Sequence, residues 1–157
     1  LEFRRVLFRS LSFPKFGHPS VAWLALTPLL VALVVTNGRS AFWYGLLTGA
    51  IYFGGTVYWT TTVMATYGGL PTVVAACVTA LLVSYLALFP ACFALLVGRI
   101  VRARGAFGLV IAPFVWVTTE LGRTHLFGGF PWVLLGYSQA TVLPVAQSAS
   151  LVGVYGL

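Results

Sequence analysis

Residues 72–98 read TVVAACVTALLVSYLALFPACFALLVG, a run without a charged side chain. A helix needs about 20 mostly apolar residues to cross the hydrocarbon core of a bilayer, so this run is long enough to span one. Pro90 lies inside the run and predicts a kink, which membrane helices tolerate better than soluble ones. The stretch therefore predicts a membrane-spanning helix.

The composition of the whole chain supports the same prediction. Of 157 residues, 60% are hydrophobic and 7% are charged, whereas soluble domains carry about 25% charged residues. Lipid accepts apolar side chains on helices whose backbone groups are hydrogen-bonded internally. The formal net charge of +7 does not indicate nucleic-acid binding, because the basic residues lie between apolar runs and form no stripe. We therefore expect an all-α membrane protein that does not bind nucleic acid.

The apolar runs predict a polytopic transmembrane helix bundle over residues 11–157. Residues 1–10 hold three of the nine basic residues, and their residue pattern differs from that of the rest of the chain. We therefore interpret them as a non-native, adaptor-derived leader. The chain is still apolar where it stops, which predicts a helix truncated at that end. The predicted spans are about 21–36, 41–64, 72–98, 106–122 and 141–157, the last of them incomplete.

Small residues within the spans predict close helix packing. Gly45 and Gly49 are four residues apart, and Gly54 and Gly55 follow, a stripe that would let another helix approach. Cys77 and Cys92 have no His or Cys at metal-ligand spacing, so we interpret them as buried apolar side chains. We predict no metal site and no cofactor.

The positions of the arginines predict the orientation of the bundle. Arg39 lies in one predicted connection and residues 99–104 in another, two crossings apart, so both belong to the same side. Positively charged loops face the cytoplasm. We therefore expect residues 120–137 to lie on the periplasmic side.

Two groups of unusual residues fall in this periplasmic stretch. Glu120 and Arg123 are three residues apart, close enough to form an outer-face ion pair. The pair has two interpretations, a functional site or an anchor for a helix end at the interface. Residues 128–132, GGFPW, also have two interpretations. They bind an acyl chain, or they form part of an aromatic belt that would include Trp59.

The usual signatures of catalysis are absent from the sequence. We find no nucleophile with a convincing base, no glycine-rich phosphate loop, no His-Glu-x-x-His helix and no pair of carboxylates. The residues alone therefore indicate a helix bundle without a catalytic site.

Several short motifs resemble the bacterial apolipoprotein N-acyltransferases. The order and spacing are consistent over residues 12–157, which makes the resemblance specific. Phe13-Pro14-Lys15-Phe16-Gly17 resembles the outer loop after the first helix of that family, which implies that this helix is missing here. The motifs are Tyr58-Trp59-Thr60, Ala65-Thr66-Tyr67-Gly68-Gly69-Leu70-Pro71, Glu120-Leu121, Gly129-Phe130-Pro131-Trp132 and Gly136-Tyr137-Ser138-Gln139.

The resemblance implies an enzyme of the bacterial inner membrane. Such an enzyme transfers a fatty acyl group from a phospholipid to the N-terminal diacylglyceryl-cysteine amine of an apolipoprotein, during lipoprotein maturation. The implied partners are thus a phospholipid acyl donor, an apolipoprotein acceptor and membrane lipids. The chemistry of the family belongs to a nitrilase-like periplasmic domain with a Glu-Lys-Cys triad, which we expect after Leu157.

The resemblance assigns no catalytic residue to this chain, so we expect the fragment alone to be inactive. It does imply that Phe130, Pro131, Trp132 and Tyr137 line the passage by which lipid chains reach the catalytic domain. Two other functions fit a helix bundle: a transporter or channel, which would need polar or ionisable groups at the midplane, and a non-catalytic lipid-binding scaffold.

Overall fold

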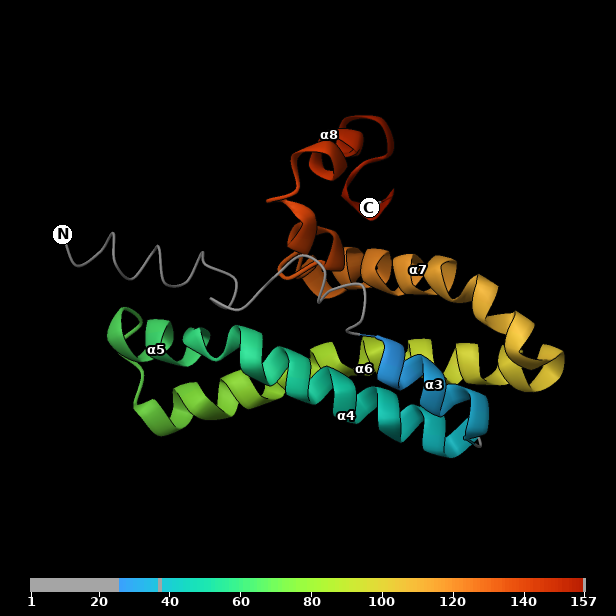
Figure 1. Ribbon diagram of the computed structural model, residues 1–157. Coiled ribbons are helices and arrows are strands. Elements are labelled where there is room, and N and C mark those ends of the chain that lie inside the picture. The colour runs from blue at the N-terminus through green and yellow to red at the C-terminus, as the bar shows by residue number, and fades with distance from the viewer. Residues whose placement is uncertain (1–25, 37, 157) are drawn as a thin grey trace. The chain divides into compact units, whose positions relative to one another are not determined.

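The computed structural model describes residues 26–36 and 38–156, all of them helical or in turns and loops (Figure 1). They divide into two compact units, Leu26–Trp132 and a smaller one in which residues 133–156 are described. The predicted leader at 1–10 and the start of the 21–36 span lie outside the described residues. The predicted all-α class is confirmed for the part of the chain that is described.

The larger unit is organised around one long helix, α6 (Thr72–Arg104), which contacts each of the unit's other helices. Its 33 residues correspond to about 50 Å at 1.5 Å per residue. The other elements are α3 (Thr27–Val35), α4 (Gly38–Val57), α5 (Trp59–Thr66), the 3-10 helix η1 (Gly105–Ile111), α7 (Ala112–His125) and the 3-10 helix η2 (Leu126–Gly128).

The basic segment 99–104 is helical, so the loop predicted there is wrong. The helix ends at Arg104, and Gly105 follows it with a φ of 67°, which suits glycine. Arg102 and Arg104 lie in the last turn, where a positive side chain is favoured by the helix dipole. Charge therefore stabilises the end of α6 instead of breaking the helix.

The span predicted at 41–64 is two helices. α4 begins at Gly38, so Arg39 lies in its first turn and not in a loop, and α4 ends at Val57. After Tyr58 the chain continues as α5. The Thr60 hydroxyl donates to the Val57 carbonyl oxygen at 2.8 Å, a local bond of the kind that competes with regular helix geometry.

The span predicted at 106–122 is also divided. Its first residues form η1, and α7 begins at Ala112. Pro113 lies in the first turn of α7, where the missing N–H has no helical partner to lose. Pro28 and Pro144 occupy the same place in their own helices.

Two of the four glycines in α4 make the predicted close contact, and the other two do not. A Cβ at Gly45 would lie 2.6 Å from the Cβ of Ala94, and one at Gly49 would lie 2.8 Å from the Cα of Ala87. At Gly54 and Gly55 a Cβ would meet nothing within 4 Å. The close packing of α4 on α6 thus ends before Gly54.

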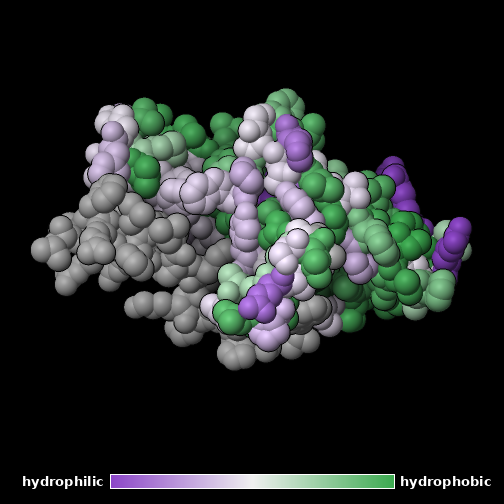
Figure 2. Space-filling model, turned by 90° about the horizontal axis from the view of Figure 1, so that it is seen from above, coloured by the Kyte–Doolittle hydropathy of each residue, from purple (hydrophilic) through white to green (hydrophobic). Residues whose placement is uncertain are grey.

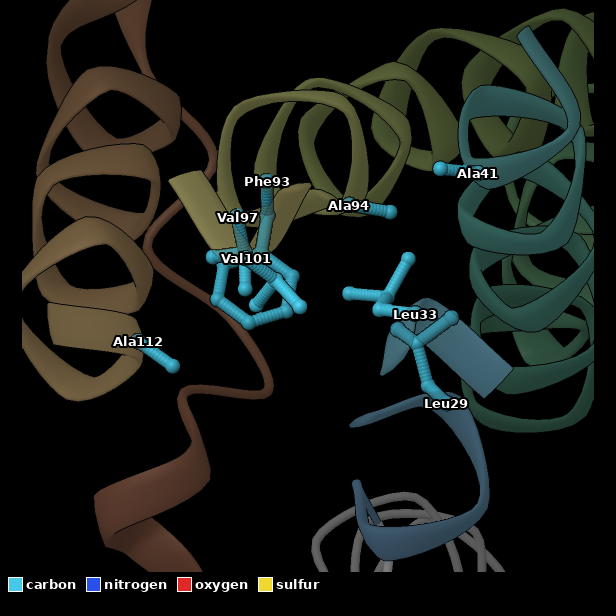
Figure 3. Close-up of a cluster of buried hydrophobic side chains, with 8 residues drawn as sticks. All are labelled: Leu29, Leu33, Ala41, Phe93, Ala94, Val97, Val101 and Ala112. Carbon is cyan, nitrogen blue, oxygen red and sulfur yellow. The ribbon is translucent and has the colours of Figure 1, made fainter. Parts of the chain in front are cut away.

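The core of the larger unit joins four of its helices. Leu29 and Leu33 of α3 face Phe93 and its neighbours on α6 (Figure 3). The ring of Phe93 also packs edge-on against Trp116 of α7, with 5.0 Å between ring centroids. The buried members of this cluster are Leu29, Leu33, Ala41, Phe93, Ala94, Val97, Val101 and Ala112.

Much of the surface of the helices is apolar (Figure 2). Cys77 and Cys92 are exposed on α6, so the prediction that they are buried is wrong. Among the described residues, one helical stretch, Thr72–Gly128, is long and apolar enough to cross a membrane by length and composition. It includes the chain reversal after α6, and α6 alone exceeds the about 20 residues that a span requires.

The smaller unit consists of the 3-10 helix η3 (Leu135–Gln139), α8 (Leu143–Val152) and the 3-10 helix η4 (Val154–Gly156). The single incomplete span predicted at 141–157 is therefore wrong, because α8 ends at Val152 and Gly153 follows with a φ of 71°. η3 contacts η4 where Gly136 meets the carbonyl of Val154.

Candidate functional site

A buried arginine lies at the centre of the candidate site. Arg123, in the last turns of α7, is 2% exposed, and Glu120 one turn earlier is 7% exposed. Arg123 Nη2 lies 3.7 Å from Glu120 Oε1. A buried charge is costly unless it is paired and hydrogen-bonded, and this pairing lowers that cost for both side chains.

Two further contacts hold the guanidinium of Arg123. Its Nη1 donates to the carbonyl oxygen of Trp132 at 2.7 Å. Its Cζ lies 5.2 Å from the centre of the Phe53 ring of α4, a cation–π distance. Arg123 therefore connects α7 to α4 and to the backbone of the GGFPW segment.

The chain reverses sharply between α7 and this segment. Phe127, Gly128 and Gly129 all have positive φ, at 53°, 86° and 76°. The Gly129 N–H donates to the Leu126 carbonyl, and the Phe130 N–H donates to the Arg123 carbonyl at 3.0 Å. The reversal returns the chain to Arg123, and it begins only after α7 ends at His125.

Gly129 and Gly128 provide a test of this reversal. A Cβ at Gly129 would overlap the Thr124 carbonyl and lie 2.9 Å from its carbon, whereas one at Gly128 would meet nothing within 4 Å. Both have positive φ, so alanine is strained at either position, by roughly 1–2 kcal/mol. We expect Gly129→Ala to lower the midpoint of thermal unfolding clearly more than Gly128→Ala. Equal shifts would mean that only backbone strain matters.

The Trp132 side chain of the segment lies against Trp59, the first residue of α5. The rings of Trp132 and Trp59 are 5.7 Å apart between centroids, at 52°. Trp132 is 49% exposed, Pro131 is exposed and Phe130 is half-buried. An apolar surface that is held by a buried arginine and yet remains accessible can contact an acyl chain.

The α5–α6 contact beside this surface contains three hydroxyl groups. Thr61 Oγ1 donates to Thr79 Oγ1 at 2.7 Å, and Thr60 Oγ1 lies 3.1 Å from the same atom. Thr79 Oγ1 donates in turn to the Ala75 carbonyl at 3.0 Å. Such bonds between helices compensate hydroxyl groups that face an apolar medium.

The structure brings together most of the residues singled out from the sequence. Glu120, Arg123, Phe130, Pro131 and Trp132 all belong to the larger unit. Tyr137 belongs to the smaller unit, in η3, where its side chain is exposed. Its role, like that of the others, stays a prediction.

Sequence reasoning missed the partners of Arg123 beyond Glu120. Phe53 lies 70 residues earlier (123 − 53) in the chain, and the bond to Trp132 uses a backbone carbonyl. Neither leaves a signal in residue spacing. The presence of Arg123 in so apolar a chain was the one available hint, because a buried arginine needs more than one partner.

The site offers contacts and positioning instead of acid–base chemistry. Glu120 is the only carboxylate side chain among the described residues, and it is paired with Arg123. His125 is exposed, and its Nδ1 lies 2.8 Å from the Leu121 carbonyl oxygen. Within the described part of the chain, no cluster of three His, Cys, Asp or Glu side chains could hold a metal ion.

The chain is similar to known proteins over almost its whole length. The model of the apolipoprotein N-acyltransferase N-terminal domain matches residues 7–157. Proteins named apolipoprotein N-acyltransferase are 47% identical in Geobacter metallireducens, 41% in Methylococcus capsulatus and 33% in Pasteurella multocida. The alignments cover 93–94% of this chain but only 27–29% of each relative. A match of this extent shows that the chain belongs to the family of apolipoprotein N-acyltransferase N-terminal domains.

Proposed function

We propose that this chain is the membrane portion of an acyltransferase that moves a fatty acyl group from a phospholipid to the N-terminal diacylglyceryl-cysteine amine of apolipoproteins. The family match over residues 7–157 carries the proposal. The chain spans less than a third of the length of its relatives. In this proposal the catalytic step belongs to a nitrilase-like domain of the full-length enzyme, as the family resemblance implies, and the part described here binds and admits lipid.

We further propose that the chain is a multi-pass protein of the bacterial inner membrane. Ala41 of α4 lies against Gly98 of α6, so Arg39 and the arginines after Gly98 are at the same end of this antiparallel pair. Clustering at one end is what the preference of positive charge for the cytoplasmic side requires. The exposed apolar side chains of α4 and α6 are suited to contact with lipid.

The position of the candidate site along α6 supports a periplasmic location for residues 120–137. Gly122 lies against Phe89, and the Tyr85 hydroxyl donates to the Leu126 carbonyl at 3.4 Å. Phe89 and Tyr85 precede Arg99 by about 15 and 21 Å along the helix axis, at 1.5 Å per residue. In a hydrocarbon core about 30 Å thick, these distances correspond to positions from the midplane toward the face remote from the basic end.

In this proposal Phe130, Pro131 and Trp132 of the larger unit line the passage for acyl chains, and the role of Tyr137 stays the one that the resemblance implies. The half-exposed ring of Trp132 beside Trp59 supports it, because two indoles offer a broad apolar contact. Arg123 and Glu120 then form an anchor that keeps the Trp132 backbone in place.

We expect Trp132→Ala in the full-length enzyme to weaken acyl transfer more than it weakens folding. The substitution removes an exposed apolar ring, while the backbone carbonyl that Arg123 binds is retained. Acyl transfer to a diacylglyceryl peptide and the unfolding midpoint are measured on the same preparation. Trp43→Ala is the matched control, since Trp43 of α4 is 65% exposed and lies beside the basic end. If Trp132→Ala lowers activity and stability equally, Trp132 is a residue of the aromatic belt without a role in acyl transfer.

The proposed function itself is tested on the intact gene. We expect the reading frame to continue past the codon for Leu157 into a soluble domain with a Glu, a Lys and a Cys in its triad. The encoded protein, in phospholipid vesicles, should form an acyl-enzyme thioester and pass the acyl group to the peptide amine. A stop codon in the intact gene, or a full-length protein that never acquires an acyl group, would overturn the proposal.

A further inference from the structure

A cleft lies at the end of α6 that is remote from the candidate site. Its volume is about 350 Å³, and it is lined by Arg99, Ile100, Ala103, Arg104 and Ile111. Arg99 and Ala103 are four residues apart, as are Ile100 and Arg104, so the α6 side of the cleft consists of two neighbouring rows of the helix surface. Each row contributes one guanidinium and one apolar side chain.

Two glycines bring the opposite wall into place. Gly105 reverses the chain with a φ of 67°, and Gly108 of η1 then packs directly on α6. A Cβ at Gly108 would lie 3.0 Å from both the Ile100 Cγ2 and the Val101 nitrogen. This close approach holds η1 against the last turns of α6, and Ile111 closes the cleft from the η1 side.

The cleft carries positive charge without a neutralising carboxylate. The whole sequence contains two acidic residues, Glu2 and Glu120. Glu2 lies in the part that the structure does not describe, and Glu120 is paired with Arg123 near the level of Phe89. Among the described residues, no ion pair involves Arg99 or Arg104, and both are exposed, so these two arginines are open to an external anion.

We propose that this cleft binds the phosphate headgroup of an anionic phospholipid such as phosphatidylglycerol. Two guanidinium groups attract an anionic phosphodiester and supply N–H donors to its oxygen acceptors. Ile100 and Ile111 supply apolar walls, and the exposed Phe107 and Val110 of η1 offer a surface for the acyl chains. A lipid satisfies both halves of the cleft, whereas free phosphate satisfies only the charged half. The proposal rests on the proposed membrane location and not on the acyl-transfer activity.

Lipid binding to the full-length protein tests this site. The purified protein, in a non-ionic detergent, is titrated with phosphatidylglycerol, phosphatidylethanolamine and inorganic phosphate in turn, and bound lipid is counted by native mass spectrometry. We expect retention of phosphatidylglycerol over phosphatidylethanolamine. The double substitution Arg99→Gln with Arg104→Gln should weaken it about tenfold or more, because two charge-assisted contacts are removed.

Arg102→Gln is the matched control, because Arg102 is exposed on the same helix and does not line the cleft. We expect this single change to leave phosphatidylglycerol retention within about twofold of the unsubstituted protein. If Arg102→Gln weakens retention as much as the double substitution, the lipid is held by general electrostatic attraction to the basic end and the proposed site is refuted. If inorganic phosphate displaces the bound lipid when both are at the same concentration, free phosphate and not the lipid is the ligand.

A second variant keeps the test decisive if the double substitution disturbs folding. Ile111→Glu places a carboxylate on the η1 wall of the cleft, where it repels an anion while both arginines stay. It should also abolish preferential retention of phosphatidylglycerol, with helical circular dichroism unchanged. Undiminished retention in this variant would refute the site. Because the readout is bound lipid, a protein without acyl-transfer activity would still report on the cleft.

Discussion

Arg123→Met is expected to destabilise the full-length protein by about 3–5 kcal/mol, since it breaks a buried ion pair by removing one partner. The substitution leaves the Glu120 carboxylate buried and removes the donor to the Trp132 carbonyl. It also removes the cation over the Phe53 ring. The expected readouts are a lower amount of protein in the membrane and a lower midpoint of denaturation.

Two controls separate the buried charge from other causes. Arg102→Met removes an exposed arginine and should have little effect. Adding Glu120→Gln to Arg123→Met should restore part of the lost stability, because no unpaired charge then remains buried. Equal destabilisation by Arg102→Met and Arg123→Met would contradict the pairing seen here.

Glu120→Gln alone distinguishes the anchor from a functional site. As part of an anchor, Glu120 should be needed for stability, so its substitution should lower abundance. Normal abundance combined with lost acyl transfer would instead assign the carboxylate a functional role. The same preparations serve for both measurements.

Gly45→Ala is expected to destabilise the pair formed by α4 and α6 by about 1–3 kcal/mol, through overpacking. The added Cβ would overlap the Pro90 carbonyl oxygen and lie 2.8 Å from the Ala91 Cα. Backbone atoms of an adjoining helix cannot rotate away, so the helices must separate. The midpoint of thermal unfolding in detergent measures the effect.

Gly55→Ala is the matched control on the same helix. A Cβ there meets nothing within 4 Å, and alanine favours a helix over glycine by about 0.8–1.0 kcal/mol. The two variants should therefore shift the unfolding midpoint in opposite directions. Shifts of the same sign and size would show that helix propensity, and not the contact with α6, governs this part of α4.

Local patterns predicted the outline of the structure. The charge-free run 72–98 predicted the helix around which the larger unit packs, and the spacing of Glu120 and Arg123 placed their side chains on one helical face. Both are local effects, because burial in an apolar medium and the rise of a helix depend on neighbouring residues. Predicted boundaries failed at residues 99–104, where charge was taken to end the helix, and at residues 58–60, where the break between α4 and α5 was not predicted.

The sequence by itself determined that this protein is helical and, through its motifs, to which family it belongs. Only the tertiary structure decided that Gly45 packs on α6 while Gly55 does not, that Arg123 holds the Trp132 carbonyl, and that η1 closes a cleft over Arg99. These contacts join residues that lie far apart in the chain or use backbone atoms common to every residue. Composition and spacing cannot encode them, because they arise only when helices settle into one packing arrangement.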